Sequence, residues 1–185
     1  MMDIKKYLSR MKGGEKCPPR KPFSKIVWSW FGAFVGIFAI TQLNGILEIN
    51  GTDSIFLIGS FGASAVLLYG VPMAELSQPR NLIFGHLISA TIGVSIYYLF
   101  SDYIPLACAL AVSISIAAMH LTRSLHPPAG ATALIAVIGA PKIHQLGYWY
   151  ILSPVLTGAL ILLMVALVIN NLSSNSKRHY PRYWI

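Results

Sequence analysis

Six apolar segments, separated by short polar connections, constrain the fold of this chain more than any other feature. They cover residues 26–43, 55–71, 82–100, 104–121, 129–140 and 150–169. Four of them approach or reach the roughly 18–20 residues that an α-helix needs to cross a bilayer. Only 11% of the residues are charged, against about 25% in an ordinary soluble domain. The sequence therefore predicts an all-α polytopic membrane protein.

The fifth segment is directly preceded by two prolines, Pro127 and Pro128. Proline suits the first turn of a helix and disrupts a helix interior. We therefore expect a short helix from about Pro128 to Gly139 that begins inside the membrane. Only small side chains surround its first N–H groups, and the N-terminus of a helix attracts an anion.

The second segment resembles the fifth, and it is also interrupted, by Gly59, Ser60 and Gly62. Its sequence GASAVLLYGVP (62–72) is similar to GATALIAVIGAP (130–141), with one residue inserted. If every segment crosses once, the six segments form two inverted three-segment repeats, 26–100 and 104–170, whose middle segments are broken into half-helices. Several transporters build a midplane site in this way. Chance similarity between two small-residue helices is the alternative.

The basic residues favour the same topology. With six crossings, thirteen of the fourteen Lys and Arg residues lie on one side and only Lys142 lies on the other. Because positive charge is retained inside, we expect a multi-pass protein of the cell inner (plasma) membrane with both termini cytoplasmic. The domains are then a basic cytoplasmic tail at 1–25, a single transmembrane domain at 26–172 and a basic C-terminal tail at 173–185. The first tail is either an interfacial helix on the lipid surface or unstructured.

The positive net charge does not indicate nucleic acid as a partner, because the basic residues of the N-terminal tail do not form a patch that is interleaved with aromatic side chains.

Small residues recur at helical spacing in two segments, as Gly32 and Gly36 and as Ala107, Ala111, Ser115 and Ala118. Such faces let helices pack closely in lipid. They serve either packing within one bundle or a homo-oligomer interface.

Two opposed half-helices would form a path for a small inorganic anion between their N-termini. The residues expected to line this path offer N–H groups and hydroxyls without fixed charge: Ser60, Gly62, Ala63, Ser64, His126, Gly130, Ala131 and Thr132. For Ser64 and Thr132, a hydrogen bond to a carbonyl of their own helix is the alternative role.

His126 either lines the path or only caps the break. Protonation near pH 6.5 would add a positive charge beside the path. His86 and His120 lie in other segments without nearby carboxylates, so we expect interhelical partners and no metal site. No cofactor is expected, and the absence of a nucleophile–base pair argues against an enzyme.

Arg80, Asn81 and Arg123 are expected at the inner mouth of the path, at the cytoplasmic ends of their segments. An arginine there concentrates anions or binds lipid phosphate.

Four motifs resemble the signature of the HPP family of integral membrane proteins. They are LTRSLHPPAGATA (121–133), GSFGAS (59–64), QPRN (78–81) and the pair Asn170-Asn171, within a resemblance from about Trp28 to Leu172. The resemblance implies a transporter, since plastid and cyanobacterial relatives are associated with nitrite transport. It also implies about four transmembrane helices, which departs from the six crossings above.

We therefore expect a transporter or channel for a small monovalent anion, with nitrite as the leading candidate. Transport would be passive or proton-linked, because the sequence contains no nucleotide-binding loop. A membrane sensor or structural membrane partner without transport activity is the alternative.

Overall fold

The computed structural model describes residues 4–46 and 59–185, and all regular elements within these residues are helices. The prediction of an all-α membrane protein is confirmed. Four of the described helices are long and apolar enough to cross a membrane: α2 (Phe23–Ile46), α4 (Pro79–Phe100), α5 (Ile104–Leu121) and the continuous pair η3 (Ile151–Leu156) and α8 (Thr157–Leu172).

Shorter elements lie among the four spans in the described part of the chain. They are α3 (Gly59–Ala65), which continues as the π-helix η1 (Val66–Gly70), the 3-10 turn η2 (Glu75–Ser77), α6 (Pro127–Ile138) and α7 (Pro141–Leu146). The expected helix from Pro128 to Gly139 therefore exists and is displaced by one residue at each end. A helix of 12 residues rises about 18 Å, less than the roughly 30 Å of a bilayer core. The six crossings and the inverted repeat remain predictions.

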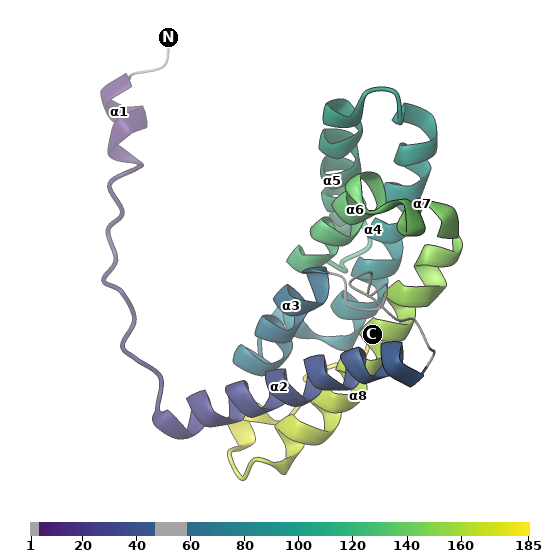
Figure 1. The fold of residues 1–185 in the computed structure, drawn as a ribbon. Coiled ribbons are helices and arrows are strands. Elements are labelled where there is room, and N and C mark those ends of the chain that lie inside the picture. The colour runs from purple at the N-terminus through teal and green to yellow at the C-terminus, as the bar shows by residue number, and fades with distance from the viewer. Residues whose placement is uncertain (1–3, 47–58) are drawn as a thin grey trace.

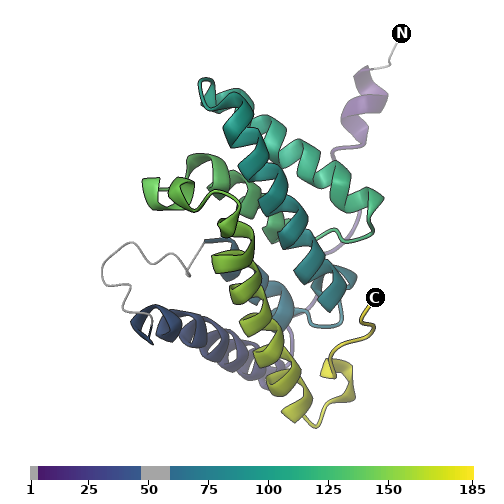
Figure 2. The same ribbon diagram turned by 90° about the vertical axis from the view of Figure 1, so that its right-hand side faces the viewer.

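The short helix α6 packs against both α4 and α5, whereas α2 packs against α8. Figures 1 and 2 show α4 and α5 as an antiparallel pair, with α2 and α8 crossing at the other end of the molecule. The helices α3 and α6, in which the two similar sequences begin, contact each other, and their role as opposed half-helices of an inverted repeat stays a prediction. The second apolar segment was expected to begin at residue 55, and its first residues lie outside the described ones, whereas the expected interruption at Gly59, Ser60 and Gly62 lies within the helix α3.

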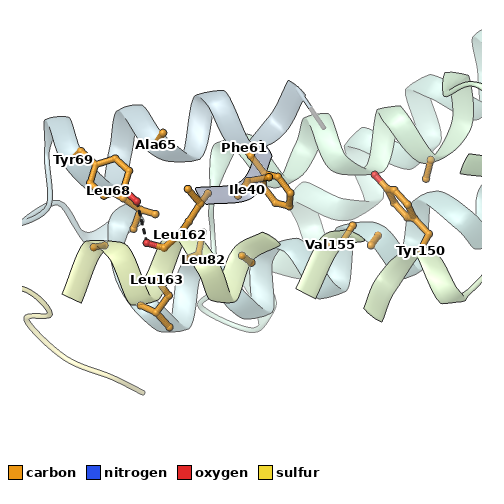
Figure 3. Close-up of a cluster of buried hydrophobic side chains, with 14 of the residues drawn as sticks. Ile40, Phe61, Ala65, Leu68, Tyr69, Leu82, Tyr150, Val155, Leu162 and Leu163 are labelled. Atoms are coloured by element: carbon orange, nitrogen blue, oxygen red, sulfur yellow. Dashed lines mark hydrogen bonds between the residues drawn. The ribbon is translucent and has the colours of Figure 1, made fainter. Parts of the chain in front are cut away.

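The hydrophobic core joins α2, α3, η1 and α8, as Figure 3 shows. The buried Tyr69 donates a hydrogen bond of 3.1 Å to the Leu162 carbonyl, and its ring packs directly against Gly32 and Gly36. This pair of small residues therefore serves packing within the bundle.

The last span contains a break that the sequence analysis did not predict. Ser153 has extended backbone angles (φ −139°, ψ 120°) before Pro154, inside η3. Proline restricts the residue before it to extended conformations, which accounts for the break.

Both terminal segments contain short helices, α1 (Ile4–Ser9) and η4 (Ser176–Arg178). All residues of α1 are exposed, and α1 lies apart from the helical body in Figure 1. The C-terminal segment, by contrast, returns to the body and has buried residues of its own, Arg178 and Tyr180.

Candidate functional site

His86, in the middle of α4, is the centre of a fully buried polar cluster. Its Nε2 lies 2.9 Å from the Ser64 hydroxyl of α3, and its Nδ1 lies 2.8 Å from the Thr132 hydroxyl of α6. Ser64 and Thr132 occupy equivalent positions in the two similar sequences at 62–72 and 130–141. One imidazole therefore bridges the two hydroxyls that the internal similarity aligns.

His126 brings a second imidazole to the same cluster. It occupies the N-cap position of α6 with an extended backbone (φ −136°, ψ 101°), but its side chain does not cap the helix. Instead its Nε2 lies 2.9 Å from Ser64 Oγ, and its Nδ1 lies 2.8 Å from the Leu76 carbonyl. That carbonyl belongs to the 3-10 turn η2 (Glu75–Ser77), so the ring connects the start of α6 to the turn preceding α4.

Ser60 completes the cluster. Its hydroxyl accepts a hydrogen bond of 2.8 Å from Thr132, while its carbonyl accepts one of 3.2 Å from Ser64. Ser64 thus bonds within its own helix as well as to both histidines, and Thr132 bonds across helices. All five cluster residues have no exposed surface: Ser60, Ser64, His86, His126 and Thr132.

A missing side chain allows α4 to approach the chain before α6. A Cβ atom at Gly85 would lie 2.7 Å from the Cβ of His126 and 2.9 Å from the Ser124 carbonyl. Real Cβ atoms rarely come this close to other atoms, so glycine at this position lets both imidazoles reach the same hydroxyl.

The cluster contains no carboxylate. The acidic residues among those described are Glu15, Glu75 and Asp102, and all three are exposed. The described residues also contain no group of three or more histidine, cysteine, aspartate and glutamate side chains that could hold a metal ion. The site therefore offers hydroxyls and imidazoles, and no acidic side chain of residues 4–46 or 59–185 is buried beside them.

Four of the eight predicted path residues belong to the cluster, and the other four lie elsewhere. Gly62 and Ala63 are exposed on α3. Gly130 and Ala131 line an apolar groove of about 470 Å³ between α5 and α6. They occupy faces of their helices that do not point into the cluster.

The three predicted mouth residues do come together near the start of α4. Arg80 donates to the carbonyls of Thr122 (2.9 Å) and Arg123 (3.3 Å), and Asn81 donates to the Leu125 carbonyl (2.8 Å). Arg123 itself has a positive φ of 53° in this loop. These contacts hold the loop that leads into His126.

A pocket of about 240 Å³ lies beside this loop, with lining residues from three parts of the chain: Glu75, Arg80, Arg123, Tyr183 and Ile185. Both arginines therefore contribute to one cavity, together with the C-terminal segment.

The C-terminal segment is the part of the site region that sequence reasoning missed. The guanidinium of Arg178 donates to the Tyr69 carbonyl (3.0 Å) and to Asn170 Oδ1 (2.8 Å), and burial lowers its pKa. Tyr180 donates to the Ser77 carbonyl (2.9 Å), and burial raises the pKa of its phenol.

The asparagine pair at the end of α8 explains how this segment is anchored. Asn170 binds Arg178, and Asn171 both donates to the Tyr180 carbonyl (2.6 Å) and accepts from its N–H (3.1 Å). Two adjacent amides at the end of an apolar segment were the available sequence signal. Likewise, a histidine within an apolar segment was the signal for His86, because ionisable groups inside a membrane protein are costly and are usually functional.

The long apolar helices and the buried polar cluster among them define a multi-pass, membrane-embedded helical protein. The family described as "HPP, transmembrane region" matches residues 18–181. The chain therefore belongs to the HPP transmembrane family.

Two relatives from Dictyostelium discoideum are each named only as a transmembrane protein. One is 46% identical over 96% of this chain and 57% of its own length. The other is 45% identical over 98% of this chain and 62% of its own length. The chain thus spans about three fifths of these relatives. No solved structure matches it.

Proposed function

We propose that this protein transports a small monovalent inorganic anion across a membrane, with nitrite as the leading candidate. The observation that carries the proposal is the polar cluster, which is completely buried where the two short helices α3 and α6 meet. Polar and ionisable groups in this environment are expensive and typically mark a substrate or ion pathway.

The chemistry of the cluster suits an anion that must bind and leave again. Hydroxyl and imidazole groups donate hydrogen bonds to an anion, and the start of α6 adds a partial positive charge. A permanent positive charge at the centre would hold the anion more tightly, and the cluster has none. Nitrite in particular is supported only by the family resemblance, since the cluster chemistry does not distinguish among small anions.

The cluster is closed to solvent, because its five residues have no exposed surface. This favours an alternating-access transporter over an open channel. In this mechanism an occluded conformation lies between two open ones.

Uptake of nitrite into proteoliposomes tests the proposal. We expect flux above that of empty liposomes, and Thr132→Val should lower it at least tenfold by removing a central hydroxyl while preserving side-chain shape. Thr91→Val is the matched control, because Thr91 is an exposed residue of α4 that bonds only to its own helix. Absence of nitrite, nitrate and chloride flux with folded, inserted protein would refute the proposal.

The sealed centre also supports a second candidate, a membrane sensor or structural partner without transport. In that role the histidine–hydroxyl network would only join helices. It predicts no anion flux, together with a loss of thermal stability when Thr132 is replaced by valine.

A further inference from the structure

With the Thr132 hydroxyl donating to Ser60, the hydrogen bonds of the polar cluster require more protons than its neutral side chains supply. Thr132 donates its single hydroxyl proton to Ser60, so the contact between Thr132 and His86 Nδ1 needs a proton on that nitrogen. His126 Nδ1 also carries a proton, because the Leu76 carbonyl that it faces can only accept.

A neutral imidazole has only one N–H group. If both rings are neutral, both Nε2 atoms therefore present lone pairs to the Ser64 hydroxyl, 2.9 Å from each. Ser64 has one proton for these two contacts and for the Ser60 carbonyl 3.2 Å away, so at least one imidazole contact has none. A single additional proton, on His86, satisfies the contacts of both imidazoles, and the Ser64 proton then goes to His126 Nε2 and not to the Ser60 carbonyl 3.2 Å away.

Two proton arrangements of the cluster satisfy the contacts of both imidazoles. In the neutral arrangement Thr132 donates to His86 Nδ1, His86 Nε2–H donates to Ser64, and Ser64 donates to His126 Nε2. In the protonated arrangement an N–H bond forms at His86 Nδ1 and the Thr132 hydroxyl turns to Ser60, while the other bonds stay the same. The observed geometry, in which Thr132 donates to Ser60, matches the protonated arrangement.

We propose that His86, linked through Ser64 to His126, is a proton-binding site that takes up one proton together with each transported anion. This inference rests on the proposed function. It goes further by naming proton–anion cotransport and the atom, His86 Nδ1, that receives the proton.

The surroundings of the pair explain why proton and anion would bind together. The titratable groups that face His86 are His126 and, on the far side of Thr132, Tyr150, whose hydroxyl donates to the Thr132 carbonyl. The ring of Phe61 covers one edge of His86, with centroids 5.6 Å apart. Because the acidic side chains of the described residues are exposed, none of them balances the charge of a buried imidazolium. An isolated buried charge is costly, so a bound anion favours protonation and the proton favours the anion.

Proton movement measured alongside nitrite flux tests the proposal. Proteoliposomes containing a pH-sensitive dye receive an inward nitrite gradient at pH 7.5, and the leak of neutral nitrous acid is measured in empty liposomes and subtracted. We expect the lumen to acidify by one proton per nitrite. In His86→Gln we expect nitrite flux at least tenfold lower and no proton movement above that of empty liposomes.

The matched control is His120→Gln, since His120 is an exposed residue of α5 outside the cluster. It should keep both the flux and the proton-to-nitrite ratio. Nitrite flux without proton movement in the unmodified protein would overturn the coupling while leaving the proposed function intact. Complete absence of anion flux would overturn both.

A second measurement does not depend on the folding of a variant. Nitrogen-15 NMR of histidine-labelled protein in bilayers distinguishes imidazole from imidazolium. We expect one imidazolium to appear when nitrite is added at pH 7.5 and to disappear in Thr132→Val, which removes the partner of His86 Nδ1. Two neutral rings at saturating nitrite would overturn the proposal.

Discussion

The packing of α6 against α4 depends on Gly93, and replacing this residue gives a sharp test of the fold around the site. A Cβ atom at this position would lie 2.6 Å from the carbonyl oxygen and 2.8 Å from the Cα of Ala133. Both atoms belong to the backbone, so no side-chain rotation can relieve the contact. Overpacking of this kind typically costs about 1–3 kcal/mol.

Gly62→Ala is the matched control for Gly93→Ala, because a Cβ at Gly62 meets no atom within 4 Å. Both substitutions gain roughly 1 kcal/mol of helix propensity, so this contribution cancels in the difference between the two variants. We therefore expect Gly93→Ala to be about 1–3 kcal/mol less stable than Gly62→Ala. For a chain of this size the difference corresponds to a Tm lower by roughly 2–12 °C.

Thermal unfolding of both purified variants in the same detergent measures this difference. The reasoning fails if the two variants unfold at the same temperature, or if Gly93→Ala is the more stable. Either result would mean that α6 does not approach α4 as closely as the structure shows.

Three further predictions concern the C-terminal segment and the topology. Arg178→Gln should lower the free energy of unfolding by roughly 2–4 kcal/mol, because it leaves buried acceptors at Tyr69 and Asn170 without their donor. Lys177→Gln, at an exposed position, should change Tm little. Equal effects of the two substitutions would contradict a stabilising role of the buried Arg178. Because burial raises the pKa of Tyr180, this residue favours the folded state fully below pH 10, where the phenol of the unfolded chain is neutral, and its contribution falls as the pH rises above 10. Tyr180→Phe should therefore flatten the decrease of Tm between pH 10 and 11, and an unchanged slope would argue against this burial. The six-crossing topology can be tested with single cysteines that replace Arg123 or Lys142 in a protein without Cys17 and Cys108. We expect the two cysteines to react with an impermeant maleimide from opposite faces of the membrane. Reaction of both from the same face would exclude that topology.

The short helix α6 could be predicted almost to the residue because local chemistry determines both ends. A proline pair fits only its first turn, and Gly139 follows its last residue. The meeting of α3 with α6 was also predicted, from the similarity of their sequences and from the need to bury irregular backbone.

Four of the five cluster residues were among the predicted path residues, but the place of His86 and the exclusion of the other four path residues could not be predicted, because both depend on helix rotation. An apolar helix in a membrane has no strongly polar face that sets its orientation, so the sequence does not show that His86 points toward Ser64 while Gly62 and Ala63 face outward. The C-terminal segment was missed for a related reason. Its basic residues suggest a solvated tail, and only the partner groups on η1 and α8 make a buried Arg178 favourable.

The C-terminal segment also bears on how this protein should be handled in experiments. Tyr180 donates a hydrogen bond to the Ser77 carbonyl, and the Arg182 backbone N–H donates one to the Gln78 side chain. The C-terminal segment is therefore attached to the turn η2 and the residue after it. The Leu76 carbonyl of the same turn accepts the hydrogen bond of His126 Nδ1. An affinity tag or a fluorescent fusion attached after Ile185 is therefore expected to disturb the contacts that hold η2, and with them the position of His126. The exposed residues around α1 provide an alternative attachment point, and comparing the two tag positions would show how strongly the C-terminal segment and the buried histidines are coupled.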